Sequence, residues 1–533
     1  MEATDFISIR DASKWASTYL QKKVTPSNIS YLVQYGRIKK FEENSSVMIS
    51  KAELKEYYQN YHSNKREEWT EILGEDLNWA LSFDQYREAE TTKHVHRLHP
   101  YKGKFIPQLV EYFLDTHTDK FKDKVFFEAG DIVLDPFVGS GTTLVQANEL
   151  GIHAVGIDIS AFNIMMAACK INEYNLGLVQ AEFDKITAML SQNPDTLKSI
   201  AFEEKLLQAL RGFNSKYFPS PEYKRQIRTG EIDEKAYAFP KEAEFLPQYQ
   251  ALIEEYGIDL LTDSHQGFID KWFIAQIKKE LEMVSRYIKS IADANTKRIV
   301  ALTLSRTMRS CRATTHADLA TLNEPVTTTY YCAKHGKICK PLFSILKWWK
   351  TYSKDTIKRL KQFNKLRTNT KQVGITGDSR NIDIIEKVNN IDPQFAKLIQ
   401  ENKIKGIFTS PPYVGMIDYH EQHAYAYELF GFERKDEMEI GPLYKGQGKE
   451  AQNSYVEGIS QVLINAKPYL KEDYDVFLVS NDKYNLYPEI AKRAGMKIVN
   501  QFKRPVLNRT EKDKGAYSEI IFHLKQDKTG SKA

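Results

Sequence analysis

The stretch IVLDPFVGSGTTLVQA, residues 132–147, decides the fold. A short apolar run ends at an acid, a glycine-rich turn follows, and a helical pattern comes next. This order is typical of the first strand, loop and helix of a doubly wound sheet. Gly139 and Gly141 allow the backbone to approach a ligand closely, and Thr142 and Thr143 can cap the helix. The stretch therefore predicts an α/β unit with a ligand site at its glycine-rich turn.

A second predicted strand, AVGID at 154–158, ends at Asp158, where an acid can bind a ribose diol. Nicotinamide cofactors and S-adenosylmethionine both use this geometry. The turn lacks the usual G-x-G-x-x-G order, because an acid and a proline precede the glycines. No Walker lysine follows Gly141, which excludes a P-loop. The segment DPFVGSGTT (135–143) closely resembles the cofactor loop of the amino-group DNA methyltransferases.

The segment IKGIFTSPPY, residues 404–413, is a predicted strand that ends at Ser410 and two prolines. Prolines lack an N–H and have a fixed φ. The backbone therefore stays extended, and its carbonyls remain free to accept hydrogen bonds. Hydrogen bonds from a base amino group to Ser410 and the Pro411 carbonyl can draw the nitrogen toward tetrahedral geometry and free its lone pair. Tyr413 can stack on a base flipped out of the duplex. Ser-Pro-Pro-Tyr resembles the catalytic tetrapeptide of the same family.

This resemblance implies a Rossmann-like class I methyltransferase sheet, S-adenosylmethionine as the cofactor, and double-stranded DNA with a flipped target base as the partner. The residues that it marks as catalytic are Ser410, Pro411, Pro412 and Tyr413. The residues expected to bind the cofactor are Phe105, Asp135, Pro136, Phe137, Gly139, Ser140, Gly141, Thr142, Thr143, Asp158 and Asp378.

Three further segments resemble parts of the same family. Residues 99–110, which include Phe105, resemble the motif that closes over the methionine moiety. Residues 377–380 resemble the motif whose acid, here Asp378, approaches the adenine amino group, although an ordinary strand-end turn remains open. Residues 417–423 are interpreted as a helix start near the pocket rather than a metal site. In addition, a central strand is expected at 474–480 and a closing hairpin at 501–524.

The first 60 residues resemble the winged helix-turn-helix of the excisionase and MerR-type group. Ser8 and Thr25 are good helix N-caps, and the segments 37–41 and 46–49 can pair as a small wing. Two groups of residues are expected to contact DNA. The major groove is expected to accommodate Ser27, Asn28 and Tyr31, and the phosphates are expected to bind Arg37, Lys39 and Lys40. A helical module for protein contacts is the alternative.

The expected organisation is a methyltransferase core interrupted by a large insertion. Its parts are a winged helix-turn-helix (1–60), a helical connector (61–94), the catalytic domain (95–170 and 371–526), a mostly helical insertion (171–370) and a tail (527–533). The insertion is interpreted as the target recognition domain, with a helical scaffold or dimer surface as the alternative.

A compact set of metal-ligand types lies in the insertion, at Cys332, His335 and Cys339. A fourth ligand is not evident, although Cys311 or His316 could supply one. Because lysines are interleaved with these residues, an ordinary basic loop is the alternative. The sequence alone therefore leaves zinc open, and we assign no metal ligand from it.

Composition places the chain among ordinary globular proteins, with 42% hydrophobic and 27% charged residues. It lacks an apolar run long enough to span a bilayer and an apolar signal-peptide core, so we expect a cytoplasmic protein without a membrane partner. Four cysteines in 533 residues exclude a disulfide scaffold. The balance of 75 Lys+Arg against 70 Asp+Glu, a net charge of +5, permits an anionic partner without demanding one.

The expected activity is site-specific methylation of an exocyclic amino group in DNA. Cytosine C5 chemistry is disfavoured because no cysteine follows a proline as its nucleophile requires. In the resembled family, Ser before Pro-Pro-Tyr goes more often with cytosine N4, and Asp or Asn with adenine N6, so cytosine N4 is expected. Methylation of adenine N6, methylation of an RNA base, and an inactive DNA-binding regulator are the alternatives. A partner restriction endonuclease is implied only by the resemblance, and the oligomeric state stays open.

Overall fold

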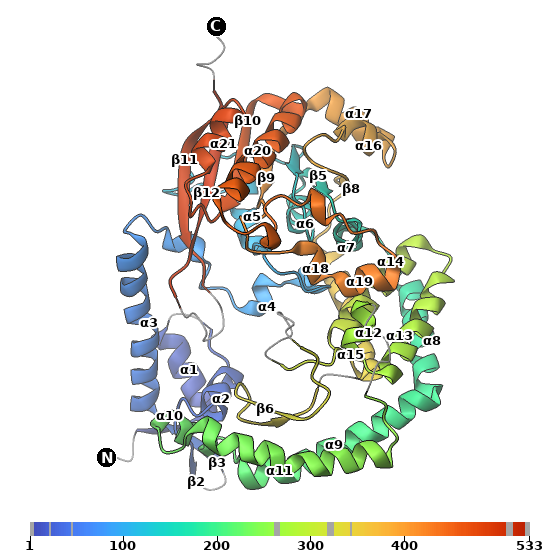
Figure 1. Cartoon of the computed structure of the whole chain (residues 1–533). Coiled ribbons are helices and arrows are strands. Elements are labelled where there is room, and N and C mark those ends of the chain that lie inside the picture. The colour runs from blue at the N-terminus through green and yellow to red at the C-terminus, as the bar shows by residue number, and fades with distance from the viewer. Residues whose placement is uncertain are drawn as a thin grey trace.

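The computed structural model of the chain describes seven stretches (Figure 1), and the statements below concern these residues. They are 5–20, 23–43, 46–260, 267–316, 324–341, 344–507 and 515–527. All but the first residue of the expected tail (527–533) lies outside them. No helix within these ranges is both long and apolar enough to cross a membrane.

A seven-stranded mixed sheet is the centre of the fold, in the order β11-β12-β10-β9-β4-β5-β8. Its strands are β4 (Ile132–Asp135), β5 (His153–Asp158), β8 (Gln372–Thr376), β9 (Ile404–Thr409), β10 (Leu470–Ser480), β11 (Met496–Pro505) and β12 (Ser518–Gln526). Strands β8, β5, β4, β9 and β10 pair in parallel, whereas β12 is antiparallel to both β10 and β11. The expected methyltransferase-like α/β fold is confirmed, including the central strand at 474–480 and the closing hairpin.

Both faces of the sheet are buried, because side chains of β4, β5, β9, β10, β11 and β12 enter two different hydrophobic cores, whereas those of β8 enter one of them. In β4, Val133 packs against one helical layer, while Ile132 and Leu134 pack against the other. The first layer contains α5 (Pro107–Leu114), α6 (Thr142–Glu149) and α7 (Ala161–Ile171). The second contains α16 (Ile384–Asn389), α17 (Pro393–Asn402), α20 (Lys449–Ala466) and α21 (Tyr487–Arg493). Shorter elements near the sheet are α18 (Tyr419–Gln422), α19 (Ala424–Phe430), η3 (Asp436–Met438), η4 (Leu443–Lys445) and η5 (Lys467–Tyr469).

The N-terminal residues form a small unit with its own core. Its elements are β1 (Phe6–Ser8), α1 (Ile9–Tyr19), α2 (Pro26–Gln34), β2 (Phe41–Glu43) and β3 (Ser46–Ser50), followed by α3 (Lys51–Leu73). Ser8 and Thr25 cap α1 and α2. The expected strand at 37–41 is wrong in its position, because the chain pairs with β3 only from Phe41 onward. The interpretation of this unit as a winged helix-turn-helix stays a prediction.

The connector and the insertion are mostly helical. The expected connector (61–94) contains the end of α3, η1 (Trp79–Ser82) and α4 (Glu88–Thr91), and η2 (His94–Arg97) crosses its boundary with the catalytic domain. The insertion contains α8 (Leu176–Gln192), α9 (Pro194–Tyr217), α10 (Glu222–Thr229), α11 (Glu234–Glu255), α12 (Phe268–Trp272), α13 (Ala275–Lys289), α14 (Ala294–Arg309) and α15 (Ile345–Phe363). Helices α8, α9 and α11 form an arc that runs from the catalytic sheet to the N-terminal unit (Figure 1). On the inner side of this arc lies a hairpin of β6 (Tyr330–Cys332) and β7 (Lys337–Cys339).

Candidate functional site

A pocket opens at the carboxyl ends of β4, β5, β8 and β9, the edge where ligands bind in open α/β sheets. Ten of the residues expected from the sequence line it. These are Phe105, Pro136, Phe137, Gly139, Ser140, Thr142, Asp158, Asp378, Ser410 and Pro412. The structure therefore brings the expected cofactor loop and the expected catalytic tetrapeptide, more than 260 residues apart in the sequence, into one pocket.

Five expected site residues do not line the pocket: Asp135, Gly141, Thr143, Pro411 and Tyr413. Asp135 is buried behind the pocket wall, where its Oδ1 accepts hydrogen bonds from Thr409 Oγ1 at 2.6 Å and Phe137 N at 3.1 Å. Burial raises the pKa of Asp135 to about 6. Because Thr409 immediately precedes the tetrapeptide, Asp135 joins the ends of β4 and β9 and fixes the tetrapeptide relative to the glycine-rich turn.

The two glycines of the turn are required for different reasons. Gly139 has φ +47°, and a Cβ there would lie 2.9 Å from the hydroxyl of Tyr101 on the pocket wall. Gly141 has φ +79°, and its Cβ would lie 2.8 Å from the Cβ of Ala167 in α7. Gly139 thus leaves room at the pocket, whereas Gly141 allows close packing of α6 on α7.

Asp158 is half-buried at the end of β5 and faces the pocket. One carboxylate oxygen accepts from Gly139 N at 2.9 Å, and the other from Ser160 N at 2.8 Å and Asn163 Nδ2 at 3.1 Å. Burial raises the pKa of Asp158 to about 6. A carboxylate offers about four lone-pair sites, so this side chain retains capacity for a further donor from a ligand.

Among the described residues that line the pocket, three have a buried polar atom without a hydrogen-bond partner: Ser140 Oγ, Asn163 Oδ1 and His420 Nε2, the last of which lies 3.7 Å from Glu439 Oε1. Buried polar groups without a partner are rare, and each calls for an explanation. Their position on the walls of the pocket indicates a polar ligand that would satisfy them.

Asp378 lies beside Asp158, because Gly377 N donates to the Asp158 carbonyl at 3.0 Å. Its carboxylate pairs with the guanidinium of Arg380, whose Nη2 lies 2.6 Å from Oδ2. The next residue, Ser379, donates to the Pro136 carbonyl at 2.7 Å. The loop after β8 is therefore attached directly to the glycine-rich turn.

The tetrapeptide forms part of the wall of the same pocket. Ser410 and Pro412 line it, whereas Pro411 is buried beneath them. The hydroxyl of Tyr413 donates to Glu519 Oε1 of β12 at 2.8 Å, which fixes the ring next to the pocket. Burial, followed by the Glu519 carboxylate, raises the pKa of Tyr413 well above its ordinary value, so the hydroxyl keeps its proton.

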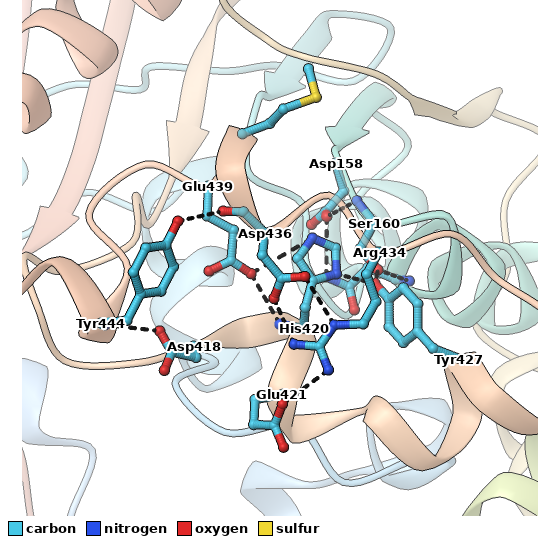
Figure 2. Close-up of polar contacts among 12 residues, drawn as sticks. Asp158, Ser160, Asp418, His420, Glu421, Tyr427, Arg434, Asp436, Glu439 and Tyr444 are labelled. Carbon is cyan, nitrogen blue, oxygen red and sulfur yellow. Dashed lines mark hydrogen bonds and ion pairs between the residues drawn. The ribbon is translucent and has the colours of Figure 1, made fainter. Parts of the chain in front are cut away.

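Several pocket residues received no role from the sequence, and three of them, Ser160, His420 and Glu439, form one polar chain with Tyr427. The Ser160 hydroxyl is hydrogen-bonded to the Tyr427 hydroxyl, which lies 2.6 Å from His420 Nδ1. The backbone N–H of His420 donates to Glu439 Oε1 at 3.0 Å. Figure 2 shows this chain running from beside Asp158 to Glu439. Burial raises the pKa of Glu439 to about 7.

These missed residues differ in how far the sequence indicates them. Ser160 follows a predicted strand and precedes a helical pattern, so its role as the N-cap of α7 could have been predicted. Tyr419 and His420 fall within the segment 417–423, which was expected near the pocket, and the structure confirms that location. Glu439 lies in an irregular region without a motif, so no signal in the sequence identifies it.

None of the residues expected to contact DNA lines this pocket. Ser27 and Tyr31 are exposed on α2, whereas the Asn28 carboxamide oxygen is used in the capping box with Thr25. Arg37 is half-buried after the end of α2. These four contacts with DNA stay predictions.

Comparisons with known proteins place these observations in context. A family model described as "DNA methylase" (N6_N4_Mtase) matches residues 11–168. The chain is 46% identical over 532 residues to the Type II methyltransferase M.MjaII of Methanocaldococcus jannaschii, covering 98% of each chain. It is 29% identical over 110 residues to the Type II methyltransferase M.MvaI of Kocuria varians, which covers 21% of this chain and 23% of the relative. The solved structure of the rRNA methyltransferase aviRa from Streptomyces viridochromogenes aligns with a TM-score of 0.26 and 9% identity. The alignment covers 83% of this chain and 94% of that chain, and the similarity is too weak for any inference.

Proposed function

Since this chain belongs to the Type II DNA methyltransferases of the N4/N6 amino-methyltransferase family, we propose that it methylates the N4 amino group of cytosine at a specific DNA site. The methyl donor is S-adenosylmethionine. The observation that carries the proposal is the single pocket that joins the glycine-rich turn, the acids after β5 and β8, and Ser410. Identification of the nucleoside methylated by the enzyme in DNA tests it.

The residues of the pocket fit this donor, which when bound supplies an electrophilic methyl group on a sulfonium cation. Asp158 would accept from the ribose diol, and Asp378 from the adenine amino group. The unpartnered Ser140 Oγ and Asn163 Oδ1 would hydrogen-bond to polar groups of the donor. The carboxylate of Asp158, which has no cationic partner in the hydrogen bonds described above, favours a cationic ligand over an anionic one, whereas the charge of Asp378 is balanced by Arg380. Gly139 leaves room for the Tyr101 side chain on the pocket wall, which a Cβ at this position would displace.

The tetrapeptide provides the acceptors for the target amine. Its Ser410 hydroxyl and Pro411 carbonyl would each accept an N–H of the base amino group, which draws the nitrogen out of conjugation with the ring. As the N–C bond forms, the bond between the methyl group and the donor sulfur would break and the sulfur would leave as a neutral thioether. The nitrogen would gain positive charge and these hydrogen bonds would strengthen, so they act mainly on the transition state. The amine then loses one proton to solvent. Asp135 supports this step as a positioning residue through Thr409.

Tyr413 would hold the flipped base by stacking. Its hydroxyl is fixed by Glu519, so the ring is oriented before the base arrives. Serine at 410, in place of an acid or its amide, favours cytosine N4 over adenine N6 on the resemblance given above. We further propose that the insertion serves as the target recognition domain and that a cognate restriction endonuclease accompanies the enzyme.

We expect Tyr413→Ala to weaken retention of the flipped base by about 1–3 kcal/mol, the value of one stacked base. The measurement is the methylation rate at subsaturating DNA. Tyr413→Phe is the matched control, because it keeps the ring and removes only the hydroxyl bonded to Glu519. If Tyr413→Phe lost as much activity as Tyr413→Ala, the hydroxyl rather than the ring would be the important group.

The N-terminal unit is proposed to bind DNA phosphates with exposed cations such as Lys39. Removal of residues 1–60 would cut α3, which continues to Leu73, so a point variant is the cleaner test. We expect Lys39→Ala to weaken DNA binding and to lower the slope of log Kd against log salt by about 0.9, the contribution of one phosphate contact. Turnover at saturating DNA should not change.

Lys55→Ala is the matched control for Lys39→Ala, because Lys55 is an exposed lysine on α3 of the same unit. It should retain the wild-type slope. A Lys39→Ala variant with the wild-type slope as well would show that this surface does not contact DNA phosphates.

A further inference from the structure

The β6–β7 hairpin of the insertion presents different residues on its two faces. Tyr331 and Ile338 pair directly and are attached to the helical arc, because Glu242 accepts from Tyr331 N at 2.9 Å and Asn214 Oδ1 accepts from Ile338 N at 2.9 Å. Side chains alternate along a strand, so Cys332 and Cys339 share the opposite face. His335 lies in the turn between them. Ile338 is also buried in the main core and Tyr331 packs against it, so this face holds the hairpin in place, and the other face gathers two thiols and an imidazole.

The distances within this cluster match those of a tetrahedral metal site. His335 Nδ1 lies 3.5 Å from Cys332 Sγ and 3.5 Å from Cys339 Sγ. With Zn–S of about 2.3 Å and Zn–N of about 2.0 Å, tetrahedral geometry separates sulfur from nitrogen by about 3.5 Å. The backbone supports this arrangement, since the N–H groups of His335 and Gly336 both donate to the Cys332 carbonyl, at 3.0 and 2.7 Å.

The structure supplies the fourth ligand that the sequence left open between Cys311 and His316. His316 completes a group with the two cysteines and His335, in which the four ligand atoms lie within 4.8 Å of one another. The hydroxyl of Tyr330 lies 2.7 Å from its Nδ1, which leaves Nε2 for a metal and provides the second hydrogen bond that metal-bound histidines usually have. Cys311 is not part of the group, since its thiol donates to the Ser344 carbonyl at 3.3 Å.

We propose that His316, Cys332, His335 and Cys339 bind one structural Zn²⁺ ion. Two thiolates and two imidazoles in tetrahedral array select zinc among the common divalent ions. Four protein ligands leave no open position for substrate or water, so the site is structural rather than catalytic. All four cysteines are free, so both thiols of the group are available.

The face of the hairpin that carries the cysteines has little core, although Ile338 on the other face is buried in the main core. Its separate hydrophobic cluster contains only three buried residues, Tyr330, Cys332 and Cys339, and two of them are ligands. Ile338 and Tyr331 hold one face of these two three-residue strands, but so small a cluster contributes little on the other face, where a metal ion would supply the link. Metal binding would also fix the segment at His316 to the hairpin.

The metal-bound turn would also position the N-terminal unit. The Lys224 ammonium donates to the Lys334 carbonyl in the turn and lies 4.0 Å from the centre of the Tyr35 ring, just after α2. On the other side of this contact, Arg228 donates to the Tyr35 carbonyl at 2.9 Å. The turn, α10 and the end of α2 therefore form one contact region. Loss of the ion would loosen this region and leave the pocket for S-adenosylmethionine intact.

The first experiment measures zinc by mass spectrometry of the metal in full-length protein purified without chelator. We expect one zinc per chain in the wild type, and less than a tenth of that in Cys332→Ala and in His316→Ala. The matched control is Cys311→Ser, which changes a buried cysteine of the same insertion outside the group and should retain one zinc. Co²⁺ exchanged into the wild type should show the visible absorption of tetrahedral cobalt with thiolate ligands.

The wild-type measurements keep the proposal falsifiable even if a ligand variant fails to fold. A metal-free wild type in which Cys332 and Cys339 form a disulfide, or react with thiol reagents as fast as unfolded protein does, would overturn it. Zinc retained in His316→Ala but lost in Cys311→Ser would overturn the assignment of the fourth ligand. Proteolysis near residues 35 and 224 should become faster when a chelator removes the zinc, whereas affinity for S-adenosylmethionine should stay within twofold.

Discussion

Ser410→Ala is expected to lower the turnover number about 10²- to 10³-fold, the effect of removing one preorganised hydrogen-bonding group from a reaction centre. Its hydroxyl is the only side-chain acceptor that the tetrapeptide offers the base amine in the proposed geometry. The effect falls on turnover because the bond to Ser410 strengthens as the nitrogen becomes tetrahedral. Single-turnover methylation with both substrates saturating measures this change directly.

Binding measurements separate this role from a structural one. Ser410→Ala should bind DNA and S-adenosylmethionine within about threefold of the wild type, because the rigid backbone of Pro411 and Pro412 is unchanged. A variant that methylates at the wild-type rate would show that the tetrapeptide is structural here. A variant that loses cofactor affinity in proportion to its rate would place Ser410 in donor binding instead.

Asp158→Ala is expected to weaken S-adenosylmethionine binding by about 1–3 kcal/mol, or roughly 5- to 150-fold, through loss of charge-assisted bonds to the ribose diol. The structure also predicts that the affinity for S-adenosylmethionine depends on pH. Burial raises the pKa of Asp158 to about 6, so its carboxylate takes up a proton as the pH falls through this value. The protonated form accepts fewer hydrogen bonds and has no charge, so affinity should fall below about pH 6 and level off above it.

Calorimetry from pH 5 to pH 8 measures both effects. Asp158→Asn should have low affinity throughout and lose the transition near pH 6. Glu439 also lines the pocket, and burial raises its pKa to about 7, so Glu439→Gln serves to separate the two groups. Asp135 behind the pocket wall also has a pKa of about 6, so Asp158 would be the source only if Glu439→Gln kept the transition near pH 6 and Asp158→Asn lost it. Unchanged affinity in Asp158→Ala would remove this residue from the cofactor site.

The sheet and most of the pocket could be predicted because their signals are local. Each of β4, β5, β8 and β9 is an apolar run that ends at a polar or glycine-rich turn, and parallel strands carry such turns to one edge of a sheet. Ten expected residues therefore meet in one pocket. Asp135 was placed in the cofactor site by its position in the motif. Its burial and its bond to Thr409 depend on a strand 270 residues away, which the local sequence does not contain.

Other features depend on contacts between distant segments. Glu439 reaches the pocket from an irregular region, where nothing in the local sequence indicates which side chain turns inward. His316 is separated from the β6–β7 hairpin by more than ten residues, so ligand spacing alone could not select it over Cys311. In the N-terminal unit, alternation alone did not decide where β2 begins, because Arg37 to Lys40 lack a clear pattern and the strand starts only at Phe41.

The most direct test of the central claim is to incubate duplex DNA with the enzyme and S-adenosylmethionine carrying a labelled methyl group, digest the DNA to nucleosides, and identify the labelled product. The proposal predicts label in N4-methylcytosine, with none in C5-methylcytosine, and little or no label when Ser410→Ala replaces the wild type. Label in N6-methyladenine would keep the amino-group chemistry and contradict the assignment to cytosine. Label found only in RNA, or in neither nucleic acid although the cofactor binds, would contradict the proposed function itself.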